Sequence, residues 1–270
     1  MRKRKWNGYL IAGAIITTII VVWILVGRFY TPYPPTKMSS AKLQGPSLAH
    51  LFGTDKFGRD IFSRVMQGSG TTLMIAALTI LIGAGVGTIV GSITGYFGGI
   101  ADEVLMRFND ALTAFPSILL ALVIISILGS GKHNVIIALG IVFIPSYARM
   151  MRTAFAAQRE VNYITSARLM GASSARILMV HMLPNTIHVL LPALTIGFNN
   201  AVLAEASMSF LGIGVTPPDA SLGYMLSEAQ SMLSRAPWYA LTTGCVIALL
   251  VFGAGLIGEG LQKMDREVAA

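Results

Sequence analysis

Long apolar runs alternate with shorter polar stretches along most of this chain. Six runs come close to the roughly 20 apolar residues that an α-helix needs to cross the hydrocarbon core of a bilayer. We expect transmembrane helices near residues 9–26, 72–96, 105–128, 135–151, 187–211 and 238–261. The pattern therefore predicts an all-α membrane protein with six transmembrane helices joined by polar segments.

The composition agrees with this pattern. Of the 270 residues, 54% are hydrophobic and only 12% are charged, which is about half the charged share of an ordinary globular protein. The mean hydropathy is +0.69. These values argue against a soluble protein with a very large core. The single cysteine, Cys245, lies in an apolar run, so an intrachain disulfide is excluded and a packing role is expected.

The net charge of +8 does not indicate a nucleic-acid partner, because the basic residues gather at the ends of the apolar runs and form no stripe with aromatic residues. Basic residues beside a membrane span favour the cytoplasmic side. Four of the first five residues are basic, so the first span is expected to be an uncleaved signal anchor with a cytoplasmic N-terminus.

Six spans then place both termini in the cytoplasm. We divide the chain into a tail with the first helix (1–27), an extracytoplasmic segment (28–71), a core transmembrane domain (72–261) with a cytoplasmic loop (152–186), and a cytoplasmic C-terminal tail (262–270). The charge pattern supports this orientation only in part, because six of the twenty Lys and Arg residues lie in the external segment.

The second predicted span has a glycine at every fourth position. Gly83, Gly87, Gly91 and Gly95 line one face of a helix, where a neighbouring backbone can approach closely. Close helix packing, within the chain or against a partner, is the interpretation that this pattern favours. A glycine-lined translocation path is the alternative.

Three charged residues are expected at or near membrane depth. Arg107 and Asp110 are three residues apart, so they can pair on one helix face, either at the cytoplasmic interface or in a cavity. Glu205 lies deeper, within an apolar run. A carboxylate inside a membrane is costly and by default suggests a functional site. Glu205 is expected either at the outer mouth of a path or at the cap of a helix that breaks there.

The polar loop between the fourth and fifth spans has the pattern of two short helices around a glycine turn. Residues 163–170 can form the first helix, and Gly171 can adopt the positive φ of the turn. Ser173 and Ser174 can cap a second helix over residues 175–182, after which Pro184 opens the chain into the fifth span. Taken alone, this spacing fits a docking element and an ordinary solvated loop equally well.

Enzyme and metal motifs give no comparable signal. The nearest match to a phosphate-binding loop is residues 126–133, SILGSGKH, which lack the leading Gly and the Ser or Thr that binds Mg²⁺. His50, His133, His181 and His188 do not form a metal-ligand pattern. We therefore expect no catalytic residue, no metal site and no cofactor on this chain.

Four stretches together resemble one family of transport proteins. Residues 51–64 are similar to LGTDxxGRDxxSR, residues 106–117 to RxxDxxxxFPxLLLA, residues 163–185 to YxxAARxLGASxxRIxxxHxLPN, and residues 205–218 to EASLSFLGLGVxPP. These motifs are found, in this order, in permeases of ATP-binding-cassette (ABC) importers of the dipeptide, oligopeptide and nickel family. The short N-terminus and the first and last motifs resemble its "C" subtype.

The resemblance implies the ABC type I importer permease fold and a prokaryotic cytoplasmic (inner) membrane location. It implies four kinds of partner: a homologous "B" permease, two ABC ATPase subunits that hold ATP and Mg²⁺, an extracytoplasmic substrate-binding protein, and membrane lipid. It also implies that the loop is the EAA-type coupling helix that docks on the ATPase. Mapped onto this sequence, the coupling residues are Tyr163, Ser166, Ala167, Arg168, Gly171, Ala172, Arg176, Leu183 and Pro184.

The chain departs from the family pattern at Thr165-Ser166-Ala167, where Glu-Ala-Ala is usual, and at the C-terminus. The substrate class expected from the resemblance is di- or oligopeptides, with nickel or a metal chelate as the alternative. The competing class is a secondary transporter driven by an ion gradient. Such a transporter would need paired membrane charges and internal repeats, and the sequence shows one deep carboxylate and no repeat.

Overall fold

The computed structural model describes residues 7–269, with side chains through residue 264. The predicted tail residues 1–6 lie outside this range. Within it the fold is helical apart from an isolated β-bridge between Thr54 and Asp60. The elements are α1 (Gly8–Phe29), α2 (Ile61–Phe97), α3 (Gly99–Thr113), α4 (Ser117–Leu128), α5 (Lys132–Gln158), α6 (Asn162–Leu169), α7 (Ser174–Arg176), the π-helical η1 (Ile177–Met182), α8 (Leu183–Phe210), α9 (Leu222–Gln230) and α10 (Pro237–Ala269).

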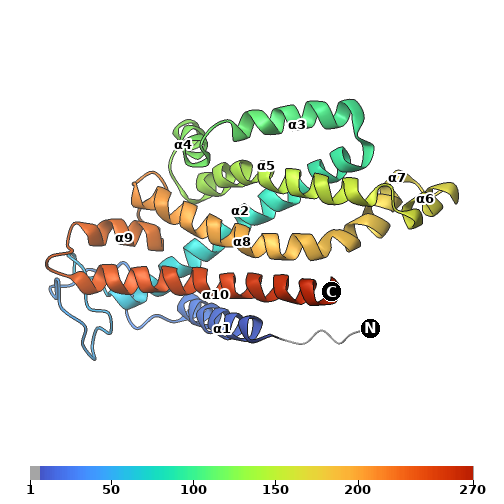
Figure 1. Ribbon diagram of the computed structural model, residues 1–270. Helices are drawn as coiled ribbons and strands as arrows, with labels where there is room; N and C mark the ends of the chain where they lie inside the picture. The colour runs from blue at the N-terminus through green and yellow to red at the C-terminus, as the bar shows by residue number, and fades with distance from the viewer. Residues whose placement is uncertain (1–6, 270) are drawn as a thin grey trace.

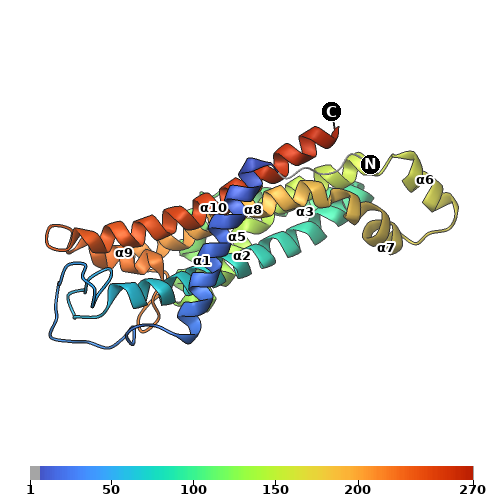
Figure 2. The same ribbon diagram turned by 90° about the horizontal axis from the view of Figure 1, so that it is seen from below.

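The long helices α1, α2, α5, α8 and α10 form an elongated bundle (Figures 1 and 2). At one end lie α6 and α7, and at the other lie α9 and the irregular segment 30–60. The start of α1 and the last turns of α10 lie side by side, since Asn7 Nδ2 donates to the Gly260 carbonyl at 2.8 Å. Figure 1 places both toward the α6 end.

The structure confirms an all-helical protein with enough apolar helices for six spans. Within residues 7–269, five helices are long and apolar enough to cross a membrane, and the bent pair α3 and α4 can count as a sixth span. The apolar core fills the centre of the bundle and includes Ile61, Val65, Val202 and Tyr239.

The third predicted span is not one straight helix. It is divided into α3 and α4, whose axes meet at 89°. The break falls at Pro116, whose ψ of 128° is extended. Proline lacks a backbone N–H and disfavours helical geometry in the residue before it, so the helix ends just ahead of it. The expectation of a continuous helix over 105–128 is therefore wrong.

Two further elements differ from the sequence prediction. Helix α2 begins at Ile61, about three turns before the predicted start of the second span. Its N-cap is Asp60, whose Oδ2 accepts from the Ser63 amide at 2.8 Å. Helix α9 is an unpredicted short helix, capped by Ser221, between the fifth and sixth spans.

The glycine face of α2 packs against α5. A Cβ at Gly83 or Gly87 would lie 2.7 or 2.6 Å from the Cβ atoms of Phe143 and Tyr147. At Gly91 and Gly95 it would lie 2.5 Å from a carbonyl oxygen of α5. All four glycines are buried. They therefore form a close helix–helix contact within the chain and line no path.

Candidate functional site

The loop between α5 and α8 forms a compact projection at one end of the bundle. Helix α6 ends at Leu169, and Gly171 follows with a φ of +83°, as the sequence predicts. Ser173 then caps the start of α7, where its side chain accepts from the Arg176 amide. Left-handed backbone of this kind is costly for residues other than glycine, so Gly171 fixes the angle between α6 and α7.

One face of the projection is anchored in the bundle. Ile164 of α6, together with Ile177 and Met182 of η1, is buried against Met151 and Phe155 of α5. Tyr96 of α2 belongs to the same cluster. Ala167, Ala172 and Leu183, which we expected at the docking surface, are only half exposed and pack against this cluster. The projection is thus packed against two of the long helices, α2 and α5.

The opposite face is open and partly apolar. Leu169 and Met170 are 84% and 86% exposed at the tip of α6. Ser166, Gly171 and Arg176 are also exposed. The polar members of this face were predicted from the sequence, and the two apolar ones were not. Their signal was available, because two large apolar residues directly before a turn glycine cannot both pack inward on a short helix.

Two predicted coupling residues have contacts within the chain. The Arg168 guanidinium lies 5.6 Å over the Tyr96 ring, so its side chain reaches back to α2. The Tyr163 hydroxyl donates to Gln158 Oε1 and accepts from Asn185 Nδ2, both at 3.0 Å. Tyr163 therefore links α6 to the end of α5 and the start of α8, beside a shallow depression of about 590 Å³.

The predicted second short helix is not separated from the fifth span. Residues from Ser174 to Phe210 form one continuous helical stretch. Pro184 sits in the first turn of α8, directly after the π-helical turn η1, where the Leu183 amide bonds to the carbonyl of Leu178. The wider π turn accommodates the proline, which cannot donate. Helix α7 is thus continuous with α8 through η1.

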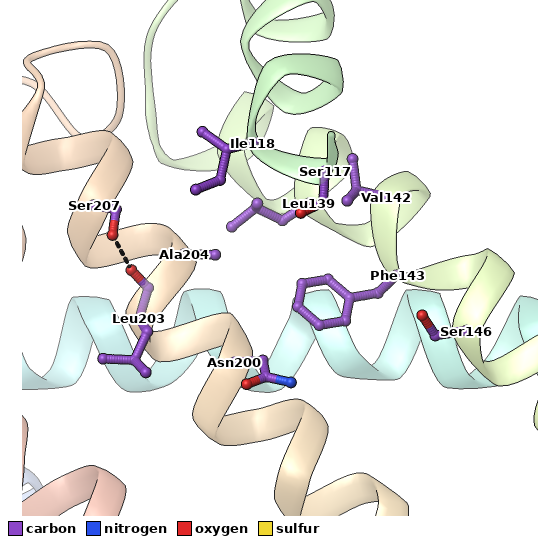
Figure 3. A pocket seen from close by; sticks show the side chains of 10 residues that line it. All are labelled: Ser117, Ile118, Leu139, Val142, Phe143, Ser146, Asn200, Leu203, Ala204 and Ser207. Atoms are coloured by element: carbon purple, nitrogen blue, oxygen red, sulfur yellow. Dashed lines mark hydrogen bonds between the residues drawn. The ribbon is translucent and has the colours of Figure 1, made fainter. Parts of the chain in front are cut away.

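A second feature is a hollow of about 350 Å³ among α4, α5 and α8. In Figure 3 the ring of Phe143 lies between Asn200 and Leu139 at its centre. The polar lining residues are Ser117 from α4, Ser146 from α5, and Asn200 and Ser207 from α8; all four are exposed. None of the ten lining residues carries a charge. This hollow was not predicted from the sequence.

The expected pair between Arg107 and Asp110 does not form. Asp110 instead pairs with Arg149 of α5 at 2.8 Å, and Arg107 approaches Glu103 of its own helix at 3.5 Å. The side chains of Arg107 and Asp110 are 80% and 63% exposed. The pair fails because Asp110 lies close enough to α5 to meet a better-placed arginine. Asp110 therefore ties α3 to α5, and neither Arg107 nor Asp110 lines the hollow.

Glu205 is fully buried near the end of α8. It accepts from Thr72 of α2 at 3.0 Å and from Ser209 at 2.7 Å. Ser209 in turn accepts from the Val215 amide, and Thr72 from the Leu222 amide. Glu205 thus organises the point where α8 ends and α9 begins. Glu205 does not itself cap a helix, because Ser221 is the N-cap of α9, and its expected place at the mouth of a path stays a prediction.

A closed ring of four charges lies at the end opposite the projection. Asp55 Oδ2 accepts from Arg59 and Arg64, each at 2.6 Å. Both arginines also pair with Glu228 of α9, at 2.8 and 2.7 Å. The Tyr239 hydroxyl of α10 donates to Glu228 at 3.1 Å. This buried ring explains the GTDxxGRDxxSR motif, since it holds segment 51–64 against α9 and α10.

Metal ligation has no candidate within residues 7–264, where no group of three His, Cys, Asp or Glu side chains could hold an ion. The geometry instead offers an anchored projection, an uncharged hollow and a buried ring at the far end.

Several known proteins are similar to this chain in sequence. The family model for "Binding-protein-dependent transport system inner membrane component" matches residues 87–263. The dipeptide transport system permease protein DppC of Haemophilus influenzae is 35% identical, covering 96% of this chain and 90% of its own length. The glutathione transport system permease protein GsiD of Pectobacterium atrosepticum is 40% identical, covering 96% and 89%.

The fold has a solved counterpart. A chain of the MetNI methionine ABC transporter, crystallised in an inward-facing conformation, aligns with a TM-score of 0.59 at 23% identity, covering 76% of this chain and 96% of that one. Inner membrane components of this kind work with a binding protein and with separate ATPase subunits, on which ATP is bound and hydrolysed. The chain therefore belongs to the binding-protein-dependent transport system inner membrane components, as the non-catalytic, multi-pass permease subunit of a bacterial ABC importer.

Proposed function

We propose that this chain is one of two permeases in a peptide importer. Its partners are a homologous "B" permease, two ABC ATPase subunits and an extracytoplasmic binding protein. The projection formed by α6, Gly171 and α7 docks into a cleft of the ATPase, with both chain termini on the same, cytoplasmic side. The observation that carries the proposal is the two-sided build of this projection: an exposed tip at Leu169 and Met170, and a back face buried against α2 and α5.

The mechanism follows from this attachment. ATP-driven closure of the ATPase moves its cleft, and the docked tip moves with it. Because the back face is packed on α5 and continues into α8, the displacement passes to these helices as a rigid-body shift. Exposed apolar side chains at the tip supply burial on docking, at roughly 25 cal/mol for each Å² removed from water.

The substrate class we propose is di- or oligopeptides. The curated relatives described above are named for dipeptide and glutathione transport. The uncharged hollow agrees with this class, since neutral hydroxyl and amide groups bind peptide amides and offer no ligand set for a bare nickel ion.

The decisive test is transport by the purified complex in proteoliposomes. We expect peptide uptake that requires the binding protein and ATP and that persists when ion gradients are collapsed. Uptake that continues without ATP and stops when a gradient is abolished would refute the ABC mechanism in favour of a secondary transporter.

Gly171 gives a matched pair of variants for the coupling step. A Cβ there meets no atom within 4 Å, so only the backbone φ of +83° is tested. Gly171→Val places a β-branched residue in left-handed geometry, whereas asparagine tolerates it. We expect Gly171→Val to reduce uptake per complex at least tenfold while Gly171→Asn retains most of it. Both variants should insert into the membrane equally. Equal uptake by the two would show that the turn does not couple.

A further inference from the structure

Three of the four polar side chains of the hollow have no hydrogen-bond partner within the described part of the chain. Ser146 and Asn200 are exposed, yet both lie well inside helices that are long and apolar enough to span a membrane. Their side chains, and that of Ser117, make no hydrogen bond to any residue in the described part of the chain. Ser207 donates to the Leu203 carbonyl at 2.7 Å and keeps free acceptor capacity.

Lipid cannot be the natural neighbour of this face. The Asn200 amide and the hydroxyls of Ser117 and Ser146, turned toward hydrocarbon, would lose their hydrogen bonds to water without replacement. The hollow needs an occupant that offers both donors and acceptors. Its volume of about 350 Å³ lies at the small end of the range for ligand pockets.

The chemistry of the lining defines the occupant. The Asn200 side chain presents a donor and an acceptor, and each serine hydroxyl can do either. No lining group carries a charge, so carboxylate, ammonium and metal ions find no counter-charge. The lining also offers apolar contacts, which do not depend on the orientation of the ligand, from Phe143, Leu139 and Leu203. Backbone amides, each with one N–H and one C=O, match this pattern whatever side chains they carry.

We propose that the hollow is a substrate subsite that binds the backbone amides of a passing peptide, between its charged termini, and that Asn200 and Ser146 are its main contacts. The inference rests on the proposed peptide-transport function. It assigns part of the permease's selectivity to this chain: amide-containing substrates are preferred, and side chains are tolerated broadly.

The test uses the complete reconstituted complex and a matched asparagine pair. Asn199 is the neighbour of Asn200 but faces α10, with its Nδ2 3.2 Å from where a Cβ at Gly255 would stand. We expect Asn200→Ala to lower the kcat/KM for uptake of a tripeptide about fivefold, as expected for the loss of one net hydrogen bond of about 1 kcal/mol. Asn199→Ala should leave uptake per folded complex unchanged. In both variants, the ATPase rate and the affinity for the binding protein should also be unchanged.

The substrate provides a second arm. Wild type should transport the tripeptide faster than its analogue methylated at the central amide nitrogen, and Asn200→Ala should reduce this preference. An unchanged preference, or unchanged uptake by Asn200→Ala, overturns the inference. If the unmodified complex takes up no peptide under any condition, the proposed function fails instead, so the two failures are separable.

Cysteine accessibility decides whether the hollow is open to water. The chain has one cysteine, Cys245, so Cys245→Ser gives a clean background. In that background, Asn200→Cys should react with a membrane-impermeant thiol reagent, and transported peptide should protect it. Absence of labelling, together with constitutive cross-linking of position 200 to the companion permease, would show a subunit contact there and overturn the subsite.

Discussion

The buried ring at the far end makes a quantitative prediction about stability. Asp55, Arg59, Arg64 and Glu228 contribute two negative and two positive charges, and no side chain among them is more than 15% exposed. Glu228→Gln preserves the shape of the side chain but leaves two buried arginines with one carboxylate. Removing one partner of a buried ion pair costs about 3–5 kcal/mol. We expect a loss of that size in the free energy of unfolding.

A surface pair in the same molecule is the control. Glu103 and Arg107 approach to 3.5 Å with side chains 69% and 80% exposed, and exposed pairs of this kind contribute little. The two variants, Glu228→Gln and Glu103→Gln, are compared by denaturant titration in detergent, with loss of helix as the signal for unfolding. We expect a large shift of the midpoint for the first and no measurable shift for the second.

A double variant tests the ring as a unit. Arg59→Gln combined with Glu228→Gln removes one charge of each sign and leaves Asp55 paired with Arg64 at 2.6 Å. Contacting charges in one network are coupled by about 0.5–3 kcal/mol, so the double variant should cost less than the sum of the two single variants. The reasoning is refuted if the costs add, or if Glu228→Gln is no more harmful than Glu103→Gln.

Two further predictions concern helix contacts. Gly91→Ala should destabilise the chain by about 1–3 kcal/mol, because the new Cβ would lie 2.5 Å from the Ala148 carbonyl oxygen. Gly85→Ala is the control: its Cβ would have no atom within 4 Å, so it should be neutral or slightly stabilising. Unfolding of both variants in detergent checks this. Glu205→Leu should lower the free energy of unfolding by about 1–3 kcal/mol, because it leaves the buried Thr72 hydroxyl without its acceptor. Glu205→Gln keeps an acceptor and should lose much less in the same assay. An equal loss for the two variants would contradict the hydrogen-bonding role.

Features that depend on neighbours in sequence were predictable. Apolar runs indicate helices because the side chains of each turn must be placed in the protein core or in lipid. All the long helices were predicted from such runs. Gly171 and Ser173 act within one turn of their own positions, so their roles as turn and cap followed from residue type alone. The glycine repeat of α2 indicated a close contact, although it could not name α5 as the partner.

Features that depend on distant residues were not predictable. Glu228 lies 164 positions beyond Arg64, and no local pattern relates them. The Arg107 and Asp110 prediction failed for the same reason, since it ignored Arg149 on another helix. The bend at Pro116 is different: its signal was present in the sequence, but a single proline in a span can kink a helix or end it, and the path of the following chain decides which.

The arrangement of the two candidate sites supports a mechanical connection between them. Helices α5 and α8 begin or end at the projection, where Tyr163 joins Gln158 to Asn185. The same two helices carry Ser146 and Asn200 in the hollow. Farther along, α8 is fixed through Glu205 to α2 and to the start of α9. We therefore expect a displacement at the projection to tilt α8 about this fixed end and to shift α5 with it, and the hollow lies between the two helices. Helix α4 also lines the hollow, but it is joined to α3 through the right-angle break and is not directly continuous with the projection. Movement of α5 and α8 relative to α4 is therefore what would widen or close the hollow.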